Sequence, residues 1–390
     1  MDNGAGNRGD RMVGQSGLVV IDGSHGEGGG QILRTSLTMA LLTGRPTRIE
    51  RIRAGRGQPG LRPQHLTAVR AAAAVCGGDV EGDELGSQTV TLVPGEQIRP
   101  DQYSFDVAKA SKGGSAGSVG LVLQTVLLPL ALSDGKSELE LHGGTHVAWA
   151  PSVSYLEHVF LPTLERMGVR VEVDLAQWGF YPVGGGTAQF SIARRQGVLK
   201  PITLMERGDV RRVWGIAAVT NLPSHIPQRM ANRARNVLAE EGLEARVEPR
   251  RLRGKGPGAG IFLFVEYEHA VAGFTSYGRK GLPSERVAEA ACDHLLKHHA
   301  TGAPVDPHLA DQLVLPMAMT ETVSNAGEPM ESRLVTSEVT QHLLTNVWVV
   351  QHFAVGSLSV EGQVGEPGLL AVKPRPPSTS EKVRGLDGDS

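Results

Sequence analysis

A loop near the N-terminus combines several glycines with one acidic residue. The run DGSHGEGGGQ, residues 22–31, follows the short apolar run LVVID and precedes a helical pattern. Free N–H groups at the start of a helix bind anions, and glycine lets the backbone approach phosphate closely. The run lacks both the Gly-Lys-Ser/Thr of a Walker loop and the last Gly of a dinucleotide fingerprint. It indicates a phosphate loop in which Glu27 binds Mg²⁺, and a tight turn with a solvated Glu27 is the alternative.

Arginines are concentrated in a second loop rich in glycine and proline. Arg53, Arg56 and Arg62 lie in the run RAGRGQPGLRPQH, residues 53–65. Guanidinium groups bind phosphate through paired hydrogen bonds, so with Arg34 these residues predict a cationic patch. The alternative is an ordinary solvated basic loop.

The run GGSAG, residues 113–117, matches the G-x-S-x-G pattern of hydrolases, and HGGT, residues 142–145, resembles an oxyanion motif. In those hydrolases the glycine-rich oxyanion loop precedes the serine, whereas here it follows. The preceding DVAKASK is also not the apolar strand that the pattern requires. We therefore reject a serine hydrolase and expect a turn, or a second loop facing phosphate, before a helix at 118–132.

Two histidines lie near helix starts in the C-terminal third. His342, in the run TQHLLTN, precedes an apolar helix; a lone histidine beside leucines is more often a core residue. The alternative hypothesis is that His342 is a nucleophile, because a helix N-terminus keeps an imidazole unprotonated and its lone pair free. His308 and Asp311, in HLADQ, open another helix, where Asp311 would orient a histidine, bind a cation or simply stabilise the helix start.

Composition limits the classes of function. The formal net charge of −2 gives no global signature of a polyanion-binding protein, and 4% aromatic residues argue against a long surface of stacked bases. Two cysteines exclude a disulfide framework and a cysteine-rich zinc site. Because there is neither an apolar run of membrane-spanning length nor a signal peptide, we expect a cytoplasmic protein with no membrane contact.

The elements that must position these residues alternate along the chain. Helical patterns at 30–44, 61–78, 118–132 and 151–168 are separated by short Val- and Thr-rich strands. This predicts an α+β fold built from repeated units of sheets covered by helices. A change of composition predicts a smaller α/β domain, 200–300, inserted into a large domain of 17–199 and 301–375. The polar ends, 1–16 and 376–390, are predicted to be flexible tails.

Taken together and in order, these motifs resemble the RNA 3′-terminal phosphate cyclase family of the catalytic type, from about residue 18 to 374. The resemblance rests on DGSHGEGGGQILR, IRAGRGQPGLRPQHL, ELGSQ, GSAGSVGLVLQTVLLP, GFYPVGGG, HLADQLVLPMA and HLLTN. It implies a large domain of three repeated units, each a four-stranded sheet on two helices, like the C-terminal domain of translation initiation factor three. The smaller domain is then inserted before the last unit.

The resemblance also implies a reaction. The family's nucleophilic histidine corresponds to His342, which attacks the α-phosphorus of ATP and releases pyrophosphate. AMP then moves to an RNA 3′-phosphate, and the neighbouring 2′-OH displaces it to close a 2′,3′-cyclic phosphate. The implied cosubstrate is ATP, the metal Mg²⁺ or Mn²⁺, and the partner RNA with a 3′-phosphate; no obligatory protein partner is evident.

Further residues take roles by their motif positions. Glu27 is the implied metal ligand, and Asp311 lies beside the adenylylated histidine. His308 departs from the aromatic residue of a close relative, and the loop 108–114 is longer than in that relative. The implied RNA-end site is Arg34, Arg53, Arg56, Gln64 and His65, and the implied nucleoside pocket is Gln124, Pro151, Tyr155, His308 and Gln312.

Two other functions use the same fold. A non-catalytic relative that binds RNA in ribosome biogenesis would lack the histidine, so His342 and Glu27 argue against it. An enolpyruvyl transferase has similar repeated units, but it binds small anionic substrates and forms no histidine–nucleotide adduct.

Overall fold

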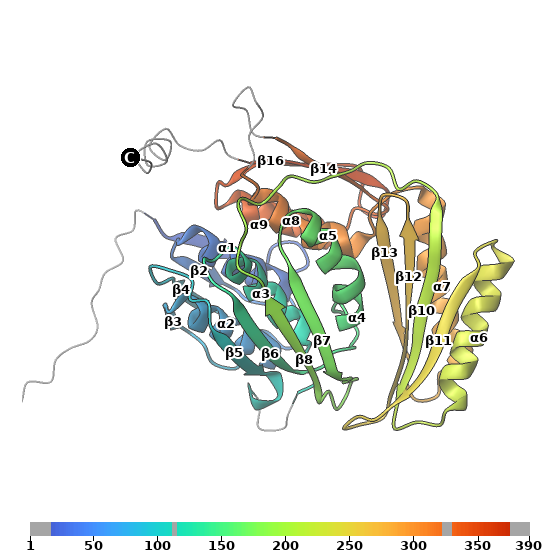
Figure 1. Cartoon of the computed structure of the whole chain (residues 1–390). Coiled ribbons are helices and arrows are strands. Elements are labelled where there is room, and N and C mark those ends of the chain that lie inside the picture. The colour runs from blue at the N-terminus through green and yellow to red at the C-terminus, as the bar shows by residue number, and fades with distance from the viewer. Residues whose placement is uncertain (1–16, 111–114, 322–329, 375–390) are drawn as a thin grey trace, which may run out of the picture.

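The computed structural model describes residues 17–110, 115–321 and 330–374, which form an α+β protein with four mixed four-stranded sheets (Figure 1). Both predicted tails, 1–16 and 376–390, lie outside the described residues. Of the predicted loop 108–114, residues 108–110 belong to a short 3₁₀ helix, Val107–Ala110, and residues 111–114 lie outside the described residues.

The first sheet is built from a strand–helix–strand–helix–strand–strand sequence. β1 and β2 are parallel because α1 crosses between them, whereas β4 pairs antiparallel with both β2 and β3, giving the order β1-β2-β4-β3. Gly44 and Gly77 end the two helices in the left-handed conformation that glycine adopts readily. The elements are β1 (Val19–Asp22), α1 (Gly30–Thr43), β2 (Thr47–Glu50), α2 (Pro63–Cys76), β3 (Asp79–Glu81) and β4 (Val90–Val93).

The second sheet repeats this topology, with the order β5-β6-β8-β7. β5 and β6 are parallel across α3, and β8 pairs antiparallel with β6 and β7. Its elements are β5 (Gln102–Asp106), α3 (Val119–Ala131), β6 (Ser137–Gly143), α4 (Val153–Tyr155), a π-helical turn (Leu156–Phe160), α5 (Leu161–Arg166), β7 (Val171–Gln177) and β8 (Gly186–Ile192).

The third sheet has the same arrangement but is assembled from distant segments. The short β9 pairs in parallel with β14, with Thr203 opposite Arg333, and the order is β15-β16-β14-β9. Its elements are β9 (Thr203–Leu204), α8 (Pro307–Ala318), β14 (Ser332–Thr336), α9 (Gln341–Gln351), β15 (Gly356–Glu361) and β16 (Gly368–Pro374).

The fourth sheet is formed by the chain between β9 and α8 and has the order β11-β10-β12-β13. Its apolar residues under α6 and α7 form a cluster separate from the large core, whereas Phe262 and Phe264 of β12 belong to the large core. Its elements are β10 (Val210–Thr220), α6 (His225–Glu240), β11 (Ala245–Leu252), β12 (Gly258–Tyr267), β13 (Val271–Tyr277) and α7 (Ser284–Thr301).

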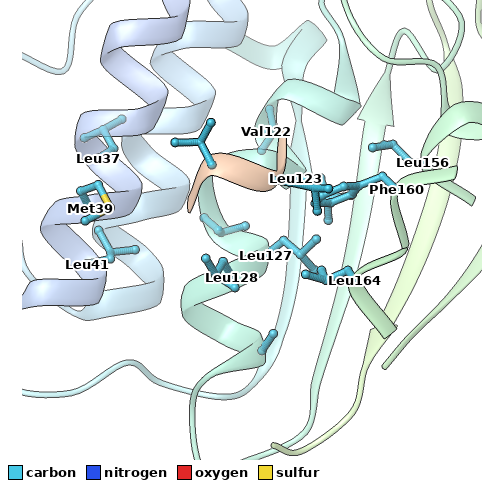
Figure 2. Packing of buried hydrophobic residues seen from close by; sticks show 14 of the residues in the cluster. Leu37, Met39, Leu41, Val122, Leu123, Leu127, Leu128, Leu156, Phe160 and Leu164 are labelled. Atoms are coloured by element: carbon cyan, nitrogen blue, oxygen red, sulfur yellow. The ribbon is translucent and has the colours of Figure 1, made fainter. Parts of the chain in front are cut away.

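The large core fixes the helices of the repeated units against one another. Figure 2 shows Leu37 and Leu41 of α1, Val122 and Leu127 of α3, and Leu164 of α5 pointing into a common apolar interior. Burial of each such side chain is worth about 1.5–3 kcal/mol, so the helix starts that carry the candidate chemical groups are held by extensive packing.

The helix predicted at 151–168 is interrupted by a π-helical turn. The amide of Leu161 bonds to the carbonyl of Leu156, one residue further back than in an α-helix. Pro162 follows at once, and a proline has no N–H and would crowd the carbonyl four residues before it. The wider turn accommodates this proline, and Pro129 is accommodated in the last turn of α3.

None of the helices among the described residues is both long enough and apolar enough to cross a membrane. Cys76 and Cys292 are buried free thiols.

His298 on α7 is expected to make stability depend on pH. Its side chain is buried, neither ring nitrogen has a hydrogen-bond partner among the described residues, and burial lowers its pKa to about 3. Between this value and the ordinary pKa, the unfolded chain binds the proton more readily, so stability falls as pH falls below about 6.5.

Substitution of His298 by leucine should therefore reduce the loss of unfolding free energy between pH 7.5 and pH 5 by about 2 kcal/mol. Urea unfolding at the two pH values measures this difference. The exposed His269 provides the matched control, because its replacement by leucine should leave the pH dependence as in the wild type. An unchanged pH dependence in the His298 variant would contradict the assignment.

Candidate active site

His342 is presented to solvent at the start of α9. It is the second residue of the helix, and the hydroxyl of Thr340 caps the helix by accepting a hydrogen bond from the amide of Leu343. The side chain of His342 is 47% exposed. The alternative of a buried core histidine is therefore wrong.

Electrostatics keep this imidazole unprotonated. Partial burial lowers the pKa of His342, and the positive charges of Arg34, His308 and Arg56 lower it further, whereas Glu27 raises it. The positive end of the α9 dipole acts in the same direction as the arginines. At neutral pH the ring therefore retains a lone pair.

The loop that carries Glu27 lies against α9. His25 stacks on Trp348 of α9 with ring centroids 3.8 Å apart, and Asp22 forms an ion pair with Arg51. Glu27 Oε2 is consequently 3.8 Å from His342 Nε2 and 3.6 Å from an Nη atom of Arg56. The glycine-rich loop and the arginine loop thus meet beside His342.

Arg34 and His65 lie over the start of α1. A Cβ at Gly30 would lie 2.3 Å from His65 Nε2 and 2.9 Å from an Nη atom of Arg34, so only glycine permits this approach. Arg34 is 7% exposed, donates to Gln31 Oε1, and has no carboxylate partner among the described residues. Burial lowers its pKa to about 10, so the guanidinium remains charged at neutral pH.

His65 has a fixed tautomer. Its Nδ1 accepts a hydrogen bond from the backbone N–H of Arg62 at 3.1 Å, and burial together with Arg34, Arg53 and Arg62 lowers its pKa to about 3. The neutral ring must therefore carry its proton on Nε2, which faces Gly30 and Arg34. Nε2–H is a donor suited to an anionic oxygen.

The structure distinguishes the loop arginines. The guanidinium of Arg53 donates to the carbonyls of Gln58 and Gly60, so it holds its own loop in shape, and the backbone of Arg53 is left-handed with φ 55°. Burial and the charges of Arg62 and Arg56 lower the pKa of Arg53. Arg56 is more exposed and reaches Glu27.

Asp311 acts on His342 through the helix cap. Thr340 Oγ1 donates to Asp311 Oδ1 at 2.6 Å, and burial raises the pKa of Asp311 well above its ordinary range. Asp311 is the fifth residue of α8, whereas Asp306 is the N-cap of that helix. The interpretation of Asp311 as a helix-start acid is therefore wrong.

Sequence reasoning assigned no role to Asn346, which joins three helices. Its side-chain oxygen accepts from Gln31 Nε2 at 2.9 Å and from Thr35 Oγ1 at 2.6 Å, both on α1. Its amide donates to the carbonyl of Asp311 on α8 at 2.8 Å. The signal was present in HLLTN, because residues four apart share a helix face and Asn346 is four residues after His342.

Replacement of Asn346 by alanine should lower the free energy of unfolding by about 2–4 kcal/mol, because several buried polar groups lose their partner. Urea denaturation measures the change. The exposed Asn232 of α6 gives the control, since its replacement by alanine should shift stability by less than about 0.5 kcal/mol. Equal stability of the two variants would show that the network contributes little.

The implied nucleoside pocket is only partly assembled around α8. Tyr155 is buried and donates its hydroxyl to both carboxylate oxygens of Asp306, at 2.8 and 3.0 Å. His308 is exposed, and its ring meets that of Tyr155 edge-on with centroids 6.2 Å apart. Gln312 donates to the carbonyl of His308, and its buried Oε1 has no partner among the described residues.

Of the remaining predicted residues, Gln64 contacts the unit of the second sheet, whereas Gln124 and Pro151 belong to that unit. Gln64 Oε1 accepts from the amide of Ser118 at 3.2 Å, which fixes the loop before α3. Gln124 is half-buried on α3. The carbonyl of Pro151 lies against Gly120, at the start of the same helix. Asp306 was missed, although the sequence Asp-Pro at a helix start is a typical N-cap signal.

Beside His342 the described residues offer a metal ion one carboxylate ligand, Glu27. Within residues 17–110, 115–321 and 330–374, no cluster of three or more His, Cys, Asp or Glu side chains is arranged to hold a metal ion. Glu27 faces the cationic loops, and Mg²⁺ commonly binds through one or two carboxylates and substrate phosphates. The single acidic ligand fits a metal that arrives with a nucleotide.

Comparisons with known proteins identify the family of this chain. The family model described as RNA 3′-terminal phosphate cyclase matches residues 25–360. RNA 3′-terminal phosphate cyclases from Nostoc punctiforme, Methylococcus capsulatus and Thermococcus onnurineus are 52%, 49% and 40% identical to this chain. The alignments cover 88%, 92% and 91% of this chain and 96%, 97% and 99% of the respective relatives.

Among solved structures, the enolpyruvyl transferase NikO from Streptomyces tendae matches 91% of this chain and 48% of its own. The identity is 10% and the TM-score 0.33, too low a similarity to bear on fold or function. With family motifs along nearly its whole length and relatives at about half identity, the chain belongs to the RNA 3′-terminal phosphate cyclase family.

Proposed function

We propose that this chain is an ATP-dependent RNA 3′-terminal phosphate cyclase that works through an AMP–histidine adduct. The observation that carries the proposal is the placement of His342, which is exposed and lies 3.8 Å from Glu27. Partial burial and the nearby Arg34 and Arg56 also lower its pKa. The rival non-catalytic relative would have no need of this histidine.

In the first step a ring nitrogen of His342 attacks the α-phosphorus of ATP. The new N–P bond forms as the bond to pyrophosphate breaks, and pyrophosphate leaves. The histidine needs no base, because its pKa is lowered and its lone pair is free. The buried guanidinium of Arg34 neutralises charge on the phosphates of ATP.

In the second step an oxygen of the RNA 3′-phosphate attacks the same phosphorus and the N–P bond breaks, which gives RNA(3′)pp(5′)A. The ribose 2′-OH then attacks the 3′-phosphorus, loses its proton and expels AMP, which closes the ring. This last step needs little more than positioning, since the 2′-OH is held beside the phosphorus by its own ribose. His65 Nε2–H and the guanidinium groups of Arg34 and Arg56 are the donors that we assign to the RNA phosphate.

Glu27 would hold Mg²⁺ or Mn²⁺ together with the nucleotide's phosphates, and the bound metal would neutralise charge on them. For the nucleoside we propose the surface near His308, Gln312 and Pro151. The buried, unpartnered Oε1 of Gln312 supports this placement, because it is an acceptor that an amino group would satisfy.

We further propose that residues 17–199 and 301–375 form the catalytic domain, and that 200–300 is an inserted domain. The shared strand order of three sheets and the separate core under α6 and α7 support this division. The likeness of each unit to the C-terminal domain of translation initiation factor three stays a prediction.

The test uses ATP labelled at the α-phosphate. We expect label to remain on the purified protein in a bond that is labile to acid and stable to base, with no retention from γ-labelled ATP. Addition of an oligoribonucleotide with a 3′-phosphate should discharge the label and give a 2′,3′-cyclic end. RNA binding without labelling would favour the non-catalytic relative.

A further inference from the structure

Two aromatic side chains are exposed to an unusual degree in a chain with few aromatics. Trp149 is 99% exposed and Tyr181 is 75% exposed. The other tryptophans have partners: Trp178 stacks on His146, Trp348 stacks on His25, and Trp214 packs against Phe264. The backbone of Trp149 also has φ 66°, a conformation that residues other than glycine rarely adopt. The fold thus holds this indole out in water at a cost in strain.

The segments that carry the two rings are fastened to each other. Trp149 lies in the loop after β6, and Tyr181 lies in the turn between β7 and β8. The amides of Thr145 and His146 both donate to the carbonyl of Gly179 at 3.0 Å, and the amide of Gly179 donates to Thr145 Oγ1 at 2.8 Å. The two segments that carry the exposed rings are therefore joined by three hydrogen bonds.

A basic loop borders the same turn. The turn between β11 and β12 lies beside the end of β7 and β8 at the bottom of Figure 1, and a Cβ at Gly185 would lie 2.5 Å from the Lys255 side chain. Arg253 and Lys255 are exposed and form no ion pair with any side chain in the described ranges. Lys255 also lines a cavity of about 250 Å³ together with Lys109, His142 and Asp106.

The aromatic pair is connected to the candidate active site by a short series of contacts. A Cβ at Gly184 would lie 2.9 Å from Ala116 Cα, and the backbone of Gly144 pairs with Ser118. The amide of Ser118 donates to Gln64, the residue before His65. The segments that carry the two rings and the segment that carries His65 are therefore neighbours in the fold.

We propose that Trp149, Tyr181, Arg253 and Lys255 form a binding surface for the single-stranded RNA upstream of the 3′ end. The proposal rests on the proposed function, which supplies the RNA. Aromatic faces stack on any base and basic side chains contact the phosphates, so the surface would bind RNA without regard to its sequence. Two rings account for one or two bases, in accord with the low aromatic content.

The decisive experiment compares RNA lengths without ATP. Binding of a decaribonucleotide and of a dinucleotide, each with a 3′-phosphate and a 5′ fluorophore, is followed by anisotropy. Trp149→Ala should weaken decamer binding by about 5–150-fold, the range for one stacked base, while dinucleotide binding and histidine labelling stay unchanged. Trp149→Phe, which keeps a ring, should retain most of the affinity.

The basic side chains give a second readout. The double variant Arg253→Ala/Lys255→Ala should flatten the slope of log affinity against log salt by about 0.7 for each lost phosphate contact. Unchanged decamer binding by the Trp149 and basic variants, or equal losses for both RNA lengths, would overturn the proposal. Reduced histidine labelling would instead place the indole on the adenine of ATP. If wild-type protein binds the decamer but never takes label from ATP, the proposed function fails and this surface stands.

Discussion

Replacement of His342 by alanine is expected to abolish covalent attachment of AMP. No other group at the start of α9 offers a free lone pair beside Glu27, among the residues that the structure describes. Loss of a nucleophile removes the covalent path itself, so the rate of labelling from α-labelled ATP should fall by about 10⁴-fold or more. Cyclisation of an RNA 3′-phosphate should fall equally, because transfer to RNA requires the adduct.

Stability should hardly change in this variant, since the His342 side chain is 47% exposed and the cap of α9 is made by Thr340. The matched control is His352→Ala, which removes an exposed histidine from the C-terminal end of the same helix. This control should label at the wild-type rate. Label retained on the His342 variant, at any position, would show that the nucleophile is a different residue.

Local patterns were sufficient for the elements that carry the site. The apolar run before Gly23, the glycines after α1 and α2, and the apolar helices that start near His308 and His342 are signals that depend on neighbours in sequence. The convergence of Glu27, Arg56 and His342 is different, because it joins the first and third repeated units. Spacing alone does not place them together, and their association followed from the family resemblance.

The parts that sequence reasoning missed depend on contacts between distant segments. Asn346 forms its hydrogen bonds only because α1 and α8 both pack against α9. Asp306 is likewise bonded by the hydroxyl of Tyr155, which comes from the distant α4. The π-helical turn reflects how one proline is accommodated within a packed helix. Arg53 and Arg56 are equivalent in the sequence pattern. They differ in the structure because the backbone directs the Arg53 side chain towards the carbonyls of its own loop.

Arg56 is expected to matter more for the RNA than for ATP. Its guanidinium lies 3.6 Å from Glu27 on an exposed loop, whereas the guanidinium of Arg53 is bonded to carbonyls of its own loop. Arg56 is therefore free to move onto an incoming phosphate. A donor aimed at charge that develops in the transition state is worth about 10²–10³ in rate. Arg56→Ala should therefore slow transfer of AMP to RNA by about 10²–10³ while histidine labelling slows by less than about tenfold.

Single turnovers separate the two steps. Protein labelled in advance with AMP is freed from ATP and mixed with an oligoribonucleotide 3′-phosphate, and the loss of label is followed in time. Arg56→Lys should fall between the wild type and the alanine variant, because lysine keeps the charge but not the paired hydrogen bonds. The control is Arg70→Ala, which removes an exposed arginine of α2 that pairs with Asp83. This variant should behave as the wild type. Equal losses in labelling and in transfer would assign Arg56 to the triphosphate of ATP, and the RNA phosphate would then depend on Arg34 and His65.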